Sequence, residues 1–300
     1  MKRRSLFAVA GGLLAQETTI RVDVKLVRLL VTVKSPKGEP IGNLRKEDFV
    51  VEDKGVAQEI AVFERSTAQP LSVSLLVDTS LSTATNLEYE SRAIQGFLRA
   101  LFKEGNPEDR ASLYSFHDEV RMETGFTRTL DRVLRPLAKL RPLSGTSLYD
   151  AIWFASQDLE RRSGRRVVVV VTDGGDTTSR KKYRDALEAA QRADAVIYSI
   201  LVVPIAADVG RNIGGENALS TLAGSTGGRI FQPTLGKQLD AAFAAILSDL
   251  RTQYLLGYYP RRLPADGKAF HPVRVKLTGA SVAAEGLQLL SRNGYYGDSD

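Results

Sequence analysis

The sequence predicts an α/β fold: a doubly wound, mostly parallel sheet that is inserted in, or flanked by, a small β-sandwich module. Between residues 70 and 252, short aliphatic runs alternate with amphipathic segments, the order expected of a parallel sheet covered by helices. Residues 18–66 and 253–296 instead contain short strand-like runs separated by turns. We therefore expect a leader at residues 1–15, half of a β-module at 18–66, an α/β domain at 70–252 and a C-terminal β segment at 253–296.

Residues 1–15 have the pattern of an export signal peptide. Lys2, Arg3 and Arg4 precede a short apolar run from Leu6 to Leu14, and Ala15 is a plausible cleavage position. The apolar run is too short to span a bilayer. This pattern predicts an exported protein, periplasmic or extracellular, without a stable membrane span; the alternative is an ordinary frayed N-terminus.

Composition and charge exclude several classes of function. The chain has 300 residues and no cysteine, which removes disulfide frameworks, thiolate metal sites and cysteine nucleophiles. Its formal charge is +6, and the leader supplies three of those charges without any acidic residue, so the remainder carries only +3. That excess is too small to argue for nucleic-acid binding.

The terminal segments predict a single β-module made of both ends of the chain. Residues 20–27 and 29–33 form a predicted strand, and residues 48–53 and 59–63 flank a hairpin turn at 53–55. Residues 254–260 and 273–277 form two more strands, joined across a polar turn at 266–267. Because two half-sandwiches would leave open sheet edges, we expect the C-terminal segment to complete the sheet begun by residues 18–66.

The α/β domain has strands and helices in regular succession. Its predicted strands cover residues 71–77, 110–116, 167–172, 195–203 and 229–231, with an antiparallel edge strand at 120–123. Its predicted helices cover residues 87–102, 129–140, 147–161, 181–193, 216–223 and 235–250.

Three separated stretches rich in side-chain oxygen accompany the strands of this domain. The aliphatic run 71–77 ends in Asp78-Thr79-Ser80-Leu81-Ser82, and the valine run 167–171 ends in Thr172-Asp173-Gly174-Gly175. A turn at Ser144-Gly145-Thr146-Ser147 precedes a helix between them. In open α/β sheets, ligands bind at the carboxyl ends of the strands, so these side chains are candidates for one site.

The candidate ligands of a metal ion are Asp78, Ser80, Ser82, Thr146 and Asp173. A set of two carboxylates and three hydroxyls suits a hard divalent cation, Mg²⁺ or alternatively Mn²⁺ or Ca²⁺, and disfavours zinc and copper.

These motifs resemble the metal-ion-dependent adhesion site (MIDAS) of von Willebrand factor A (VWA) domains, which have a Rossmann-like fold. The family pattern is a DxSxS motif, a later Thr in a GT turn and a later Asp in a TDG turn, and the resemblance covers roughly residues 70–250. The segment from Val31 to Phe63 is similar to the β-rich segment that precedes the VWA unit in exported bacterial VWA-related proteins. Two positions depart from the family pattern: Leu81 and Ser144 stand where glycine is frequent.

The resemblance implies a non-catalytic, adhesion- or scaffold-type module whose cation binds an acidic side chain of a protein partner. Leu81 adds an apolar side chain beside the metal, which implies either a more hydrophobic partner surface or a weakened site. Two alternatives remain at this stage: a metal-dependent phosphohydrolase, and a structural protein with a vestigial site. For Asp150, Asp176 and His117 we favour a helix start, a solvated loop acid and a structural histidine, rather than ligands or a catalytic base.

Overall fold

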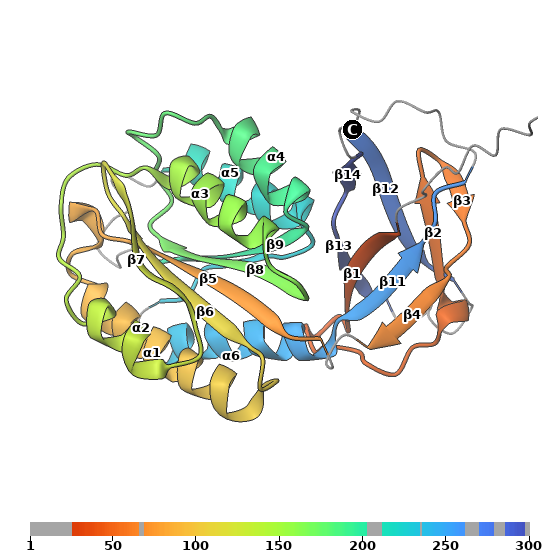
Figure 1. The fold of residues 1–300 in the computed structure, drawn as a ribbon, viewed down its shortest axis with the longest axis horizontal. Helices are drawn as coiled ribbons and strands as arrows, with labels where there is room; N and C mark the ends of the chain where they lie inside the picture. The colour runs from red at the N-terminus through yellow and green to blue at the C-terminus, as the bar shows by residue number, and fades with distance from the viewer. Residues whose placement is uncertain are drawn as a thin grey trace, which may run out of the picture.

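The computed structural model describes residues 26–65, 69–202, 212–234, 236–261, 270–278 and 286–297. The leader predicted at 1–15, most of the strand predicted from Ile20 and the turn predicted at 266–267 lie outside these residues. Figure 1 shows the α/β domain on the left and the β-module on the right.

The central sheet of the α/β domain has six strands in the order β10-β9-β8-β5-β6-β7. Strands β10, β9, β8, β5 and β6 run parallel, and β7 joins β6 as an antiparallel edge. The predicted α/β fold, with its mostly parallel sheet, is therefore confirmed. In chain order the strands are β5 (Leu71–Asp78), β6 (Arg110–Phe116), β7 (Val120–Thr127), β8 (Arg165–Thr172), β9 (Ala195–Leu201) and β10 (Ile230–Phe231).

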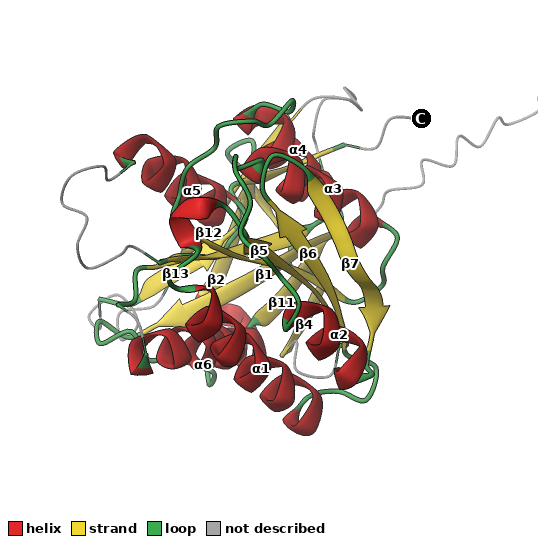
Figure 2. Cartoon of the chain, turned by 90° about the vertical axis from the view of Figure 1, so that its left-hand side faces the viewer, coloured by secondary structure: helices red, strands yellow, loops and turns green. Residues whose placement is uncertain are grey.

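Helices cover both faces of this sheet (Figure 2). Helices α1 (Leu87–Glu104), α2 (Leu130–Leu137) and α6 (Lys237–Thr252) lie on one face, and α3 (Leu148–Glu160), α4 (Tyr183–Arg192) and α5 (Ile213–Ser225) lie on the other. Alternate residues of the valine strand β8 face the two layers: Val167, Val169 and Val171 pack on the first layer, and Val168 and Val170 on the second. A strand buried on both faces is thus apolar at every position.

The β-module consists of two four-stranded sheets, β13-β1-β11-β4 and β14-β12-β2-β3, which enclose a common hydrophobic core. From the N-terminal segment come β1 (Val27–Lys34), β2 (Phe49–Asp53), β3 (Val56–Gln58) and β4 (Val62–Arg65). From the C-terminal segment come β11 (Tyr254–Tyr258), β12 (Phe270–Leu277), β13 (Gln288–Ser291) and β14 (Gly294–Tyr296). The sandwich thus interleaves strands from the N-terminal and C-terminal segments.

The described strands of the N-terminal and C-terminal segments pair through several backbone ladders. Strand β11 pairs antiparallel with β1 and β4, and β12 pairs antiparallel with β2. The pairing that the expected single β-module requires is therefore present. We propose on this basis that residues 18–66 and 253–296 form one module into which the α/β domain, residues 70–252, is inserted.

The hairpin predicted around residues 53–55 has a different second strand. Lys54 and Gly55 both have positive φ angles, 48° and 79°, as a tight two-residue turn requires. Because such a turn closes at once, Val56 already pairs with Asp53, and the returning strand is β3 rather than residues 59–63. The chain then crosses to the other sheet, where β4 pairs with β11. Strands β11 and β12, which the sequence joins across a turn, likewise lie in different sheets.

Charged side chains connect the β-module to the α/β domain. Lys34 of β1 places Nζ 2.7 Å from Oδ1 of Asp249 in α6, and both side chains are almost fully buried. Arg229 contacts the other oxygen of Asp249, with its Nε 2.8 Å from Oδ2. A buried carboxylate shared by two cations, one from each part of the chain, ties helix α6 to the β-module.

Candidate functional site

The candidate site lies at the carboxyl ends of β5 and β8, which are neighbours in the sheet. Their parallel register places Val77 opposite Val171, so Asp78 ends its strand beside Thr172. The sheet order turns in opposite directions on the two sides of β5, with β6 on one side and β8 on the other. Such a switch point leaves a crevice at the strand ends, where doubly wound proteins bind ligands.

Asp78 is fully buried and held by two hydrogen bonds. Its Oδ1 accepts from the backbone N–H of Ser80 at 2.8 Å, and its Oδ2 accepts from Oγ1 of Thr172 at 2.6 Å. Burial raises the pKa of Asp78 to about 6 although these hydrogen bonds act to lower it, and the charge of Asp173 adds to the rise. The carboxylate is therefore oriented before any ligand arrives, and it forms no ion pair with any residue that the structure describes.

Ser80 and Ser82 lie side by side after the strand, with their hydroxyl oxygens 3.0 Å apart. The short 3₁₀ turn Leu81–Thr83 brings them together. Thr83 fixes this turn, because its Oγ1 donates to the carbonyl oxygens of Asp78 (3.0 Å) and Ser80 (2.9 Å). Because of this turn, two serines separated by one residue in the sequence have adjacent hydroxyl groups.

The loop that carries Thr146 runs between the two strand ends. Leu143 forms a parallel bridge with Ser80, and the carbonyl of Thr146 accepts from the N–H groups of Thr177 and Thr178 at 2.8 and 3.2 Å. Gly145 is required in this loop: its φ is +85°, and a Cβ would lie 2.8 Å from the Cβ of Asp118. Thr146 therefore sits between the loops that carry Ser80 and Asp173.

The five predicted ligands thus lie on three neighbouring loops at one edge of the sheet. Within the described residues, the carboxylate of Asp173 and the hydroxyl of Thr146 form no hydrogen bond or ion pair. Carboxylate and hydroxyl oxygens are the donors that a hard cation prefers, so the chemistry of the predicted ligand set fits a Mg²⁺-type ion. Across the described part of the chain, no three or more His, Cys, Asp and Glu side chains group as metal ligands; the set at this edge relies on hydroxyls.

Glu90 lies close to the site and is not among the residues that the sequence motifs indicate. This residue of α1 is fully buried, and neither carboxylate oxygen has a hydrogen-bond partner in the described part of the structure. Burial, together with the charges of Asp78 and Asp173, raises its pKa to about 8. The helical period offered a signal, because Glu90 lies four residues before Ile94 and seven before Phe97, on the buried face of α1.

Three other polar residues near the site have structural roles. Asp150 accepts from the backbone N–H groups of residues 180 and 181, at 3.0 and 2.7 Å. Asp176 accepts from the N–H of Tyr149 at 3.0 Å and from Oγ of Ser179 at 2.6 Å, so it anchors the first turn of α3. His117 is buried, and its Nδ1 contacts Oδ1 of Asp118. Asp176 therefore holds its loop against α3 through hydrogen bonds, whereas the sequence suggests only a solvated loop acid.

Apolar side chains surround the polar edge. Leu81 is 62% exposed, Leu143 49% and Ile213 65%. Leu81 and Leu143 flank Ser80, and Ile213 begins α5, whose Gly215 packs directly against the carbonyl of Gly174. A surface that pairs unused polar groups with exposed aliphatic residues resembles a protein-binding surface more than an ordinary exposed loop.

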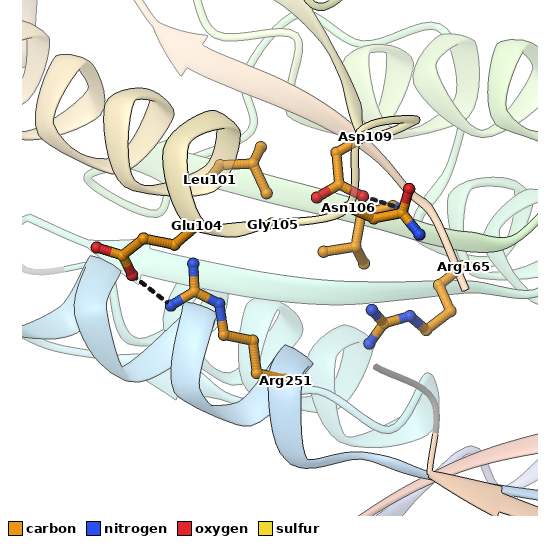
Figure 3. A pocket seen from close by; sticks show the side chains of 8 residues that line it. Leu101, Glu104, Gly105, Asn106, Asp109, Arg165 and Arg251 are labelled. Carbon is orange, nitrogen blue, oxygen red and sulfur yellow. Dashed lines mark hydrogen bonds and ion pairs between the residues drawn. The ribbon is translucent and has the colours of Figure 1, made fainter. Parts of the chain in front are cut away.

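A cavity of about 350 Å³ lies at the opposite end of β5 and is lined in part by Leu71, Asp109 and Arg251 (Figure 3). Its polar groups serve the fold. Oδ1 of Asp109 accepts from the N–H of Leu71 at 2.7 Å, and Arg251 pairs with Glu104 at 2.8 Å. These contacts stabilise the junction of α1, α6 and β5. The cavity itself is remote from the predicted ligands.

Comparison with protein families identifies the domain. Residues 73–175 match the family model of the von Willebrand factor type A domain. The chain contains a VWA domain. The match begins in β5 and ends in the turn after β8, so it includes all five predicted ligands. No curated protein matches the chain.

Several solved structures resemble the VWA domain. The vWF domain of the type V pili tip protein Mfa5 from Porphyromonas gingivalis is 14% identical, with a TM-score of 0.49, covering 66% of this chain and 99% of that one. An aerotolerance-related membrane protein from Bacteroides fragilis is 18% identical, with a TM-score of 0.47 and coverages of 60% and 98%. The PilB minor pilin from Streptococcus sanguinis is 13% identical, with a TM-score of 0.48 and coverages of 62% and 62%.

Proposed function

We propose that this VWA domain is a non-catalytic protein-binding module that uses a divalent cation at the β5–β8 edge to bind an acidic side chain of a partner. The observation that carries the proposal is the gathering of carboxylate and hydroxyl side chains on three neighbouring loops at this edge. Among the described residues, Asp78 forms no ion pair, and the side-chain oxygens of Asp173 and Thr146 form no hydrogen bond. VWA domains commonly mediate protein–protein interactions, which supports the same reading.

The chain supplies the protein half of the cation site. Ser80, Ser82 and Thr146 would offer hydroxyl oxygens, and Asp78 and Asp173 would contribute negative charge directly or through water. When bound, the cation supplies a positive centre that attracts a carboxylate, Mg²⁺ being the ion that most readily keeps positions for water or an incoming ligand. The exposed side chains of Leu81, Leu143 and Ile213 would surround that contact and exclude water.

Export is part of the proposal. The pattern of residues 1–15 supports a signal peptide and hence a periplasmic or extracellular location. No helix in the described ranges is both long and apolar enough to cross a membrane.

Calorimetric titration with MgCl₂, MnCl₂ and CaCl₂ tests the cation site. We expect saturable one-to-one binding by the wild type, and its loss in the variants Asp78→Ala and Asp173→Ala. Asp131→Ala, on an exposed position of α2, is the matched control. Equal binding by all four proteins, or none by the wild type, would contradict the proposal.

Two further assays separate the proposed function from its alternatives. A pull-down from an exported fraction, with and without EDTA, should recover a partner only when the cation is present. Turnover of p-nitrophenyl phosphate in Mg²⁺, abolished by Asp78→Ala, would instead favour the phosphohydrolase. The position two residues after Asp78 carries Ser80 rather than a second acid, so we expect no turnover.

A further inference from the structure

A cavity beside the predicted cation site has a lining of different character. Its volume is about 310 Å³, and it lies between β6, β7 and the segment from α2 to Leu143. Thr79 and Leu143 line it, and the N–H of Leu143 donates to the carbonyl of Thr79 at 2.8 Å. Since Leu143 also bridges to Ser80, the cavity and the predicted ligands share a wall.

Positive charge dominates this cavity. Arg121, Lys139 and Arg141 line it, all three are exposed, and none forms an ion pair with a described residue. The acidic residue of the lining is Glu123, whose Oε1 accepts from Oγ of Ser115 at 2.7 Å. With three cationic side chains and one hydrogen-bonded acidic side chain, the lining carries a net positive charge. It lies next to the proposed cation site, which would also attract negatively charged groups.

The rest of the lining is suited to a peptide rather than a free ion. Pro136, Leu140 and Leu143 contribute apolar surface between the charged groups. Arginine and lysine side chains commonly lie along such surface while their charged ends stay accessible. A peptide could therefore place backbone and methylene groups on the apolar wall and a carboxylate among the cations.

We propose that this cavity is an anion subsite that takes a second carboxylate of the partner, so that the recognised segment carries at least two acidic residues. One carboxylate binds the cation at the β5–β8 edge, and another binds Arg121, Lys139 and Arg141. The inference rests on the proposed function, because it places the subsite along the same bound segment. It adds the chemical class of the partner, an acidic peptide segment.

Fluorescence anisotropy with two labelled peptides tests the subsite. The probes are tetraglutamate and Gly-Glu-Gly-Gly, both amidated at the C-terminus so that only side chains supply carboxylates, each with MgCl₂ at fixed ionic strength. We expect the wild type to bind tetraglutamate about ten-fold more tightly than the single-acid peptide, and the double variant Lys139→Glu/Arg141→Glu to lose that preference. The control Arg99→Glu/Lys103→Glu makes the same change of net charge on exposed positions of α1 and should keep it.

The outcomes distinguish the subsite from the cation site. A tetraglutamate preference that persists in Lys139→Glu/Arg141→Glu, or disappears equally in the α1 control, overturns the subsite. Tetraglutamate binding that depends on Lys139 and Arg141 but is unchanged by EDTA supports the subsite and contradicts the cation site. Thermal unfolding of both double variants establishes that each is folded; should Lys139→Glu/Arg141→Glu not fold, the single variant Arg141→Gln replaces it, with Arg99→Gln as its control.

Discussion

Individual carboxyl groups in this domain are held at a cost to stability. Asp78 and Glu90 are both fully buried, and the structure describes no cationic partner for either. Each unit by which folding raises a pKa is worth about 1.4 kcal/mol of interaction between the charge and its surroundings. Groups that are unfavourable without a ligand and favourable with one are typical of functional sites.

The Glu90→Gln variant should change how stability depends on pH. Folding raises the pKa of Glu90 from 4.5 to about 8, so its contribution to stability is fully present below pH 4.5 and is lost as the pH rises through about 8. Asp78, raised from 3.8 to about 6, acts in the same direction at lower pH. In EDTA we expect the melting temperature of the wild type to fall between pH 6 and 8, and that of the variant to fall less. If the melting temperatures of the wild type and the variant fall equally with pH, Glu90 is not protonated in the folded protein.

Thr172→Val should weaken cation binding without removing a predicted ligand. The hydroxyl of Thr172 donates to Asp78 and accepts from the N–H of Gly174, so it orients both strand ends. Loss of such an outer partner typically costs about ten-fold or more in metal affinity. Calorimetric Mg²⁺ titration measures this, with Thr172→Ser as the variant that keeps the hydroxyl. Equal affinity in Thr172→Val and wild type would mean that Asp78 needs no orientation.

Residue types and spacing predict the positions of the two strand-end carboxylates and of the Thr146 turn. Apolar runs mark the buried strands that the carboxylates follow, and the turn precedes a helix. Residue type and spacing do not single out Glu90. A glutamate among charged neighbours is normally assigned to the solvent face, and only the finished packing of α1 on β5 shows that position 90 is enclosed. The sequence likewise shows Thr172 only as the last residue of a strand, because its hydrogen bond to Asp78 depends on the register between β5 and β8.

At the scale of elements, helix α6 connects the two parts of the chain. Its inner face packs in the core of the α/β domain through residues such as Phe243 and Ile246. Its Asp249 pairs with Lys34 of β1 and Arg229. The strands and helices of the α/β domain were predicted well because each has its own period. The individual partners of β3 and β4 were not, since strand pairing depends on distant segments.

Lys34→Met should destabilise the protein by about 3 kcal/mol, because it leaves a buried carboxylate without one of its two cations. The remaining pair between Arg229 and Asp249 keeps the loss near the lower end of the usual range. Urea denaturation gives the value, and Lys37→Met, at an exposed turn position, is the control. If Lys34→Met lowers the free energy of unfolding no more than Lys37→Met does, the buried pair adds nothing to stability.

At the scale of the whole molecule, the α/β domain and the β-module share part of one core. Leu30 of β1 and Leu255 of β11 belong to the same hydrophobic cluster as β5 and α6. The division into domains at residues 66–70 and 252–253 therefore separates sequence patterns rather than independent cores.

Residues 70–252 expressed alone should be less stable than the full chain. Removal of the β-module exposes the side of α6 that Leu30 and Leu255 cover, and it leaves Asp249 without Lys34. We expect a lower melting temperature and faster hydrogen exchange in the last two turns of α6. Identical exchange in α6 for both proteins would show that the domain does not depend on the module.

The junction between α6 and β11 also determines how the molecule bears tension. Only Gln253 separates the end of the helix at Thr252 from the start of the strand at Tyr254. For a pull on a partner at the far edge of the central sheet, one covalent path runs along α6 into β11, which is flanked on both sides by β1 and β4. A strand loaded along its length must shear two ladders at once instead of unzipping one bond at a time. Along this path we expect the sandwich, which lies away from the proposed partner-binding edge, to resist the load.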